Sequence, residues 1–202
     1  MNPPFFSFRY ATTALACFFL CTVAAAAQTP EEPPLWSLEA SALAATLRPA
    51  PGLRLLQHEI HPGLSAGVQR RLGHGPKHTW LIGGRLGFFH HPGLQNGLWL
   101  TPELTYRRHL FQRLSADLRV GAGYLHSFPA GPVYGYDDGR WQEMPNSGSP
   151  RFLPSLGLQL SYRLGAKTDS PSLLASWTYA PEIPSELNYH QFWGLGLAFH
   201  PF

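Results

Sequence analysis

The chain has 202 residues, of which 44% are hydrophobic and only 13% charged, and its formal net charge is +3. Its 20 Gly and 20 Pro residues exclude a helical bundle or coiled coil, and its apolar content excludes a disordered chain. The basic residues form no run longer than the pairs Arg70-Arg71 and Arg107-Arg108, so we expect no nucleic-acid partner.

Residues 1–27 have the pattern of a secretory signal peptide. Arg9 precedes about a dozen apolar residues, and four alanines ending at Ala27 supply the small residues of a cleavage site. The apolar stretch is short for a transmembrane helix, and bulky residues before Cys21 argue against a lipoprotein. Because Cys17 and Cys21 both lie in this segment, we expect no cysteine in the mature chain, and hence no disulfide or thiolate site.

Two further regions follow the signal peptide. Residues 28–35 contain three prolines and predict a short flexible lead-in, while residues 36–202 form the folded domain. No later stretch approaches the roughly 20 apolar residues of a membrane-spanning helix.

The folded domain alternates apolar with small or polar residues at the period of a β-strand. In the clearest segment, Leu156, Leu158 and Leu160 share one face, and Gly157 and Gln159 share the other. Eight such segments, separated by turn residues, are predicted at Leu38–Thr46, Leu64–Leu72, Trp80–Phe88, Trp99–His109, Leu114–Tyr124, Phe152–Leu164, Leu173–Tyr179 and Phe192–Phe202.

The polar faces indicate what the apolar faces contact. They carry Gly, Ser, Thr and isolated charges, and lysine occurs only at Lys77 and Lys167. A soluble sandwich or lipocalin-like barrel, the alternative folds, would show Lys and Glu outside. Small polar residues suit the interior of a narrow barrel, and an apolar face suits lipid. We therefore predict an all-β, eight-stranded, antiparallel up-and-down transmembrane β-barrel.

The connections and the aromatic residues fit a barrel in an outer membrane. Longer connections are predicted at 48–63, 90–97, 128–151 and 181–190, which alternate with shorter ones and leave both termini on the periplasmic side. Aromatic residues near strand ends are expected to form two interfacial belts. The periplasmic belt is Trp80, Tyr106, Tyr162 and Phe199, and the outer belt is Phe88, Trp99, Tyr124, Tyr179 and Trp193.

On these features the chain resembles the small eight-stranded outer-membrane β-barrel families of Gram-negative bacteria. The segments Ile60–Leu64, Gly123–Ser127 and Tyr134–Asp138 and the terminal Phe202 carry the resemblance. It implies location in the outer membrane, contact with lipid and lipopolysaccharide, and insertion by the outer-membrane assembly machinery through the C-terminal strand. Phe202 falls on the opposite parity from Phe199, which indicates a bulge near His200 or an imperfect insertion signal.

By strand parity, charged and amide side chains should point into the barrel and neutralise one another, because interior charges must be paired. A proton or ion path is the alternative. The predicted interior network is Glu39, Arg85, Glu103, Arg107, Asp117, Arg119, Gln159 and Arg163.

The connection at 128–151 is the best candidate for a specific function, since it mixes aromatic with charged residues. The alternative is a loop that folds over the barrel mouth and seals it. The predicted binding residues are Tyr134, Tyr136, Asp137, Asp138, Arg140 and Trp141.

Two other chemistries deserve a test. The chain has ten histidines, but only His90-His91 are adjacent and no compact ligand spacing occurs, so we expect no metal site and no cofactor. Lipid A deacylases are small outer-membrane barrels with a Ser, His and acid on the wall. Here His126 and Ser127 are strand neighbours whose side chains should point to opposite faces.

We therefore expect a monomeric, non-catalytic barrel with a structural or adhesive role in its extracellular loops. A lipid A-modifying hydrolase and a narrow small-solute conduit are the alternatives.

Overall fold

The computed structural model describes residues 34–48, 61–75, 77–92, 94–183 and 189–200. The predicted signal peptide, most of the lead-in, His58 and Phe202 lie outside the described residues. No helix within the described part of the chain is long and apolar enough to cross a membrane.

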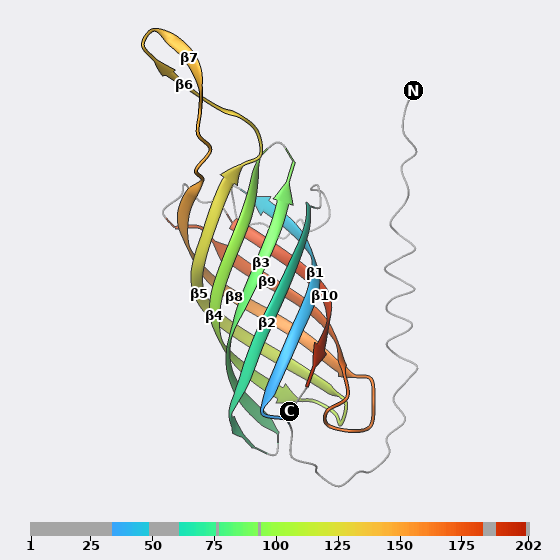
Figure 1. The fold of residues 1–202 in the computed structure, drawn as a ribbon. Helices are drawn as coiled ribbons and strands as arrows, with labels where there is room; N and C mark the ends of the chain where they lie inside the picture. Colours follow the sequence, from blue (N-terminus) through green and yellow to red (C-terminus); the bar gives the residue numbers. More distant parts are fainter. Residues whose placement is uncertain (1–33, 49–60, 76, 93, 184–188, 201–202) are drawn as a thin grey trace, which may run out of the picture. The chain divides into compact units, whose positions relative to one another are not determined.

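Eight strands close into an antiparallel barrel in the order β1-β10-β9-β8-β5-β4-β3-β2 (Figure 1). All eight predicted strands are present, and the predicted fold is confirmed. The barrel strands are β1 (Trp36–Arg48), β2 (His61–His74), β3 (His78–His91), β4 (Gln95–His109), β5 (Leu114–Pro129), β8 (Ser149–Arg163), β9 (Ser172–Pro181) and β10 (Tyr189–Phe199).

Most strands are longer than predicted, chiefly at the end away from the barrel's termini. β3 reaches His91 and β4 begins at Gln95, so the connection predicted at 90–97 is a tight turn. The segment 128–151, which was predicted as one long connection, also contains strands. β5 runs on to Pro129, and a separate two-stranded hairpin follows, β6 (Val133–Asp137) with β7 (Arg140–Met144).

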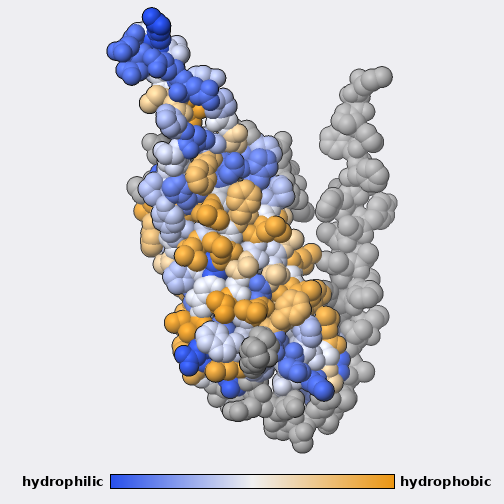
Figure 2. Space-filling model, in the orientation of Figure 1, coloured by the Kyte–Doolittle hydropathy of each residue, from blue (hydrophilic) through white to orange (hydrophobic). Residues whose placement is uncertain are grey.

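The outer wall of the barrel is apolar. Figure 2 shows hydrophobic side chains gathered on the wall, whereas the hairpin is largely hydrophilic. The exposed wall residues include Leu64, Ile82, Leu86, Leu100, Val120, Leu158 and Leu195. Because polar residues lie inside and leucines outside, the wall faces lipid and the barrel spans a membrane.

The interior has two halves of different character. Toward the middle and the end where β1 begins, it is polar, with Glu39, Asp117 and Gln159 among its buried side chains. Toward the other end it contains a buried apolar cluster. The members of this cluster are Leu43, Ala45, Phe89, Trp99, Leu125, Leu153, Ala180 and Phe192.

Trp99 corrects the predicted outer belt, because it points into the barrel and is only 5% exposed. It shares its parity on β4 with Gly97 and Thr101, which also face inward. Two glycines make room for the aromatic rings. A Cβ on Gly87 would lie 2.3 Å from the Trp99 indole, and one on Gly97 would lie 2.3 Å from the Phe89 ring. Five aromatic residues assigned to the belts are exposed on the outer wall: Trp80, Phe88, Tyr124, Trp193 and Phe199.

Candidate functional site

Glu39 on β1 is the centre of the buried polar network. Its carboxylate accepts hydrogen bonds from Arg85 on β3, at 2.7 Å, and from Arg119 on β5, at 2.9 Å. Arg85 also forms an ion pair with Glu103 on β4, at 3.3 Å. Because the strands carrying these residues lie on different sides of the barrel, the network ties opposite walls together across the lumen.

A second part of the network lies closer to the periplasmic end. The guanidinium of Arg107 donates two hydrogen bonds of 2.8 Å to the two carboxylate oxygens of Asp117. The amide of Gln159 donates to Asp117 at 3.2 Å and to Glu39 at 3.4 Å, which joins the two parts. The bidentate geometry is the strongest form of an arginine–carboxylate pair.

The charges of this network cancel within the described chain. Three guanidinium groups meet three carboxylates, in the pairs and bridges formed by Arg85, Arg107 and Arg119 with Glu39, Glu103 and Asp117. Arg163, the remaining cation of the predicted set, lies at the periplasmic end of β8 and forms no ion pair or hydrogen bond through its side chain with any part of the chain described.

A polar group that is absent from the predicted interior network lies at the other end of the lumen. The buried ring of His190 on β10 contacts the carboxylate of Glu182, and Gln95 donates to the same carboxylate at 3.4 Å. Ser127 donates to Gln95 at 2.6 Å. Burial opposes the ionisation of Glu182, but these bonds and the nearby charges of His190 and Arg151 outweigh it and lower the pKa of Glu182. The alternation of β10 would have placed His190 inside, on the same parity as Phe192.

The β6–β7 hairpin holds all six predicted binding residues in one structural unit. Asp138 and Gly139 both have positive φ, 50° and 75°, which is the backbone of a tight hairpin turn. The turn pairs Tyr136 with Trp141 across the two strands, and their rings pack edge to face with centroids 5.5 Å apart. Asp137 faces Arg140 in the same register.

The aromatic side chains of the hairpin do not cover the barrel mouth. Tyr136 is 65% exposed and Trp141 71% exposed. β6 and β7 pair only with each other among the described strands, and Figure 1 shows them rising beyond the end of the barrel. The hairpin therefore rises away from the barrel end rather than folding over it, which does not support the alternative of a sealing loop.

The structure does not bring His126 and Ser127 together. The His126 ring contacts the Tyr124 hydroxyl at 2.5 Å and the carbonyl of Ser147 at 2.9 Å, outside the barrel. Ser127 is buried inside and donates to Gln95. A serine nucleophile needs a histidine within hydrogen-bond reach, and this pair lies on opposite faces of the wall.

Histidines gather near the outer rim without forming a metal-binding group. The rings of His61 and His91 lie 3.4 Å apart, and His90 contacts the side-chain oxygen of Asn96. Within the described ranges, no three His, Cys, Asp or Glu side chains are placed to hold a metal ion.

No family model and no curated protein matches this chain. Among solved structures it is similar to Ail, the attachment invasion locus protein of Yersinia pestis, with 10% identity over 83% of this chain and 98% of that one, and a TM-score of 0.53. It is also similar to Neisserial surface protein A, with 10% identity over 82% of this chain and 96% of that one, and a TM-score of 0.53. These likenesses show the fold of small outer-membrane β-barrels.

Proposed function

The protein is an outer-membrane β-barrel, and we propose that its role is adhesive: the β6–β7 hairpin binds a partner outside the cell. The exposed pair Tyr136 and Trp141 carries this proposal. Burying large aromatic side chains supplies much of the energy of binding surfaces, and aromatic residues are concentrated at their centres. Of the two similar structures, one is an attachment invasion locus protein and the other a surface protein.

The hairpin is held where a partner can reach it. A transmembrane strand needs about 9–11 residues to cross a bilayer, whereas β5 has 16 residues and β8 has 15. Their outer ends therefore extend past the lipid and raise the hairpin above it. The two-residue turn and the cross-strand pair fix the aromatic rings in advance, so little conformational entropy is lost on binding.

The hairpin charges favour a basic or neutral partner. Asp137, Asp138 and Glu143 are carboxylates, and Arg140 is the only cation on the two strands and their turn. A partner surface with arginine or lysine would gain from electrostatic steering, and its association rate should fall with added salt.

The lumen supports this role over a conduit. Buried ion pairs fill its middle and the apolar cluster fills its outer half, so a solute would have to displace both. The side chains of His126 and Ser127 are separated by the barrel wall, and this separation gives no support to a lipid A-modifying hydrolase. The closed barrel has no open sheet edge, which fits a monomer in contact with lipid and lipopolysaccharide, and the assembly machinery would act on the C-terminal strand.

The test is whole-cell adhesion with the protein expressed on a Gram-negative surface. Cells are applied to immobilised extracellular-matrix proteins and to arrays of neutral and sulfated glycans. We expect a basic or neutral surface, and not the sulfated glycans, to retain the cells, and Trp141→Ala and Tyr136→Ala each to lower retention about tenfold, the usual loss at a central binding residue.

The control is Phe111→Ala, because Phe111 is an aromatic residue with 66% exposure in the turn at the opposite end of the barrel. It should leave adhesion unchanged. Retention that is equal in the wild type, the hairpin variants and cells without the protein would contradict the adhesive role.

A further inference from the structure

The lumen opens at the periplasmic end into a pocket with an unusual charge composition. The cavity measures about 70 Å³. By the same measure a single water needs about 10–15 Å³, so there is space for several waters or for one small anion. Four arginines line the pocket, Arg71, Arg107, Arg113 and Arg163, and no Asp or Glu is among the lining residues.

The side chain of Arg163 has no carboxylate partner within residues 34–48, 61–75, 77–92, 94–183 and 189–200. The Asp117 carboxylate already binds Arg107 through both oxygens, so the buried network offers Arg163 nothing more. The backbone N–H of Arg163 donates to the carbonyl of Arg113 at 2.8 Å, which fixes two arginines beside each other. Like charges that line one pocket repel, and an anion among them would remove that cost.

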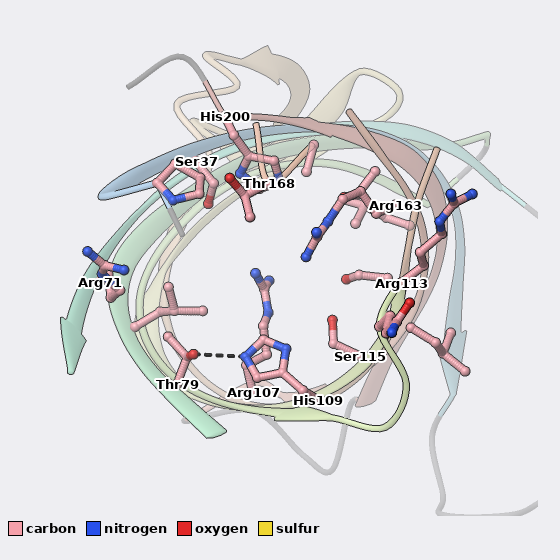
Figure 3. A pocket seen from close by; sticks show the side chains of 18 of the residues that line it. Ser37, Arg71, Thr79, Arg107, His109, Arg113, Ser115, Arg163, Thr168 and His200 are labelled. Carbon is pink, nitrogen blue, oxygen red and sulfur yellow. Dashed lines mark hydrogen bonds between the residues drawn. The ribbon is translucent and has the colours of Figure 1, made fainter. Parts of the chain in front are cut away.

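The pocket also has neutral hydrogen-bonding groups. Figure 3 shows Arg107 and Arg163 pointing into the lumen, with Ser115 and the bonded pair Thr79 and His109 close to them. The Thr79 hydroxyl and His109 Nε2 are 3.0 Å apart. Hydroxyl groups and arginine forks together are the donors that proteins use to hold oxyanions.

His200 follows the end of β10 and lines the pocket, where the positive charges of the arginines act on it. Burial lowers the pKa of His200, and the charges of Arg107 and Arg163 lower it further, to about 4, although the carboxylates of Glu39 and Asp169 act in the opposite direction. A further positive charge beside these arginines is therefore disfavoured in this pocket.

From this geometry we infer that the periplasmic mouth of the barrel is a binding site for a small soluble oxyanion of the phosphate or sulfate class, with Arg163 as its main ligand. Arg107 contributes a secondary charge from the deep side, and Ser115 and Thr79 contribute neutral groups. The ligand enters from the periplasm, because the buried network and the apolar cluster close the lumen on its outer side. This site is separate from the hairpin and its proposed adhesive role.

The test is titration of the full protein, extracted from outer membranes in a neutral detergent, with inorganic phosphate at constant ionic strength. We expect saturable one-site binding by calorimetry, and a loss of affinity of about tenfold or more in Arg163→Gln, since a hydrogen bond to a charged group is worth about 1.5–3 kcal/mol. Arg163 forms no ion pair within the described residues, so the variant should fold, which the gel mobility of unboiled samples would verify.

The matched control is Arg108→Gln, which removes an exposed arginine of β4 that is not among the residues lining the pocket. It should bind phosphate as the wild type does. A second readout is the proton resonance of His200, whose pKa should rise from about 4 when phosphate neutralises the arginines around it.

Three results would overturn the inference. One is equal phosphate affinity in Arg163→Gln and the wild type. Another is an identical effect of chloride, which would mean screening rather than a site. The third is a His200 response that occurs only in phosphatidylglycerol bilayers and not in phosphatidylcholine bilayers with phosphate, which would make the anion a lipid headgroup.

Discussion

The lumen and the β6–β7 hairpin place similar residue types in opposite environments, buried in the lumen and exposed on the hairpin. In the lumen, Glu39 and Asp117 are almost completely buried, and each carboxylate binds a guanidinium. On the hairpin, the carboxylates and the large rings of Tyr136 and Trp141 are exposed. The lumen therefore satisfies its own interactions and stabilises the barrel, whereas the hairpin leaves its interactions available to another molecule.

The largest expected effect is loss of the lumen's central carboxylate. Glu39→Ala leaves Arg85 and Arg119 as buried cations without their main partner. Removing one member of a buried ion pair costs about 3–5 kcal/mol, so the free energy of unfolding in urea should fall by that amount. Glu143→Ala on the hairpin is the control. Equal stability of the two variants would break the distinction between the regions.

A somewhat smaller loss is expected in the apolar half of the lumen. Leu125 is 0% exposed, and Leu125→Ala should lower the free energy of unfolding by about 2–4 kcal/mol through the cavity that it creates. Leu158→Ala, on the lipid-facing wall, removes the same atoms without opening an internal cavity. If denaturant titration finds the outer-wall variant to be the less stable one, the interior is not the packed region described here.

The charged end of the lumen should give the barrel a pH dependence. The folded pKa of His200 is lowered to about 4, while an unfolded histidine has a pKa near 6.5. Below pH 6.5 the unfolded chain takes up a proton that the folded barrel does not, so the contribution of His200 is complete above that pH and falls toward pH 4.

Urea titrations at pH 7 and pH 5 measure this contribution. The wild type should lose more stability between the two pH values than His200→Gln does. His90→Gln, at the opposite rim, serves as the control and should keep the full wild-type slope. A parallel decline in all three proteins would assign the pH dependence to other groups.

The smallest expected effect on stability belongs to the hairpin. Trp141→Ala removes a large ring that is 71% exposed, and surface substitutions of this kind change the free energy of unfolding by less than about 0.5 kcal/mol. The free energy of unfolding is measured by following the far-ultraviolet circular dichroism of the barrel in urea, a signal that does not depend on tryptophan fluorescence. A loss comparable to that of Glu39→Ala would mean that the ring packs on the barrel.

Strand alternation predicted the barrel because each wall residue has only two possible environments. The same rule identifies Trp99 as an interior residue through its parity with Thr101, whereas nearness to a strand end assigned it to a belt. In a transmembrane strand, parity decides which side a residue faces and position decides only its depth. The Asp138-Gly139 turn could also have been predicted from the sequence, since this dipeptide between aromatic residues is typical of a hairpin.

The partners inside the lumen were beyond the reach of the sequence. Glu39 binds Arg119, 80 positions away, because the tilt and stagger of the strands bring those levels of the barrel together. Alternation says only that both face inward. For the same reason it could not show that no carboxylate of the described residues binds Arg163, or that Glu182 lies against His190.

The ladder between β5 and β8 ends at the pair Ser127 and Ser149, so the chain leaves and re-enters the barrel wall at a single point. Residues 130–148 can change in length or sequence while the hydrogen-bond register of the wall stays the same. Natural variation can therefore replace the outer tip freely on an inherited membrane anchor. Close relatives of this barrel should differ most in residues 130–148 and least in the residues around Glu39.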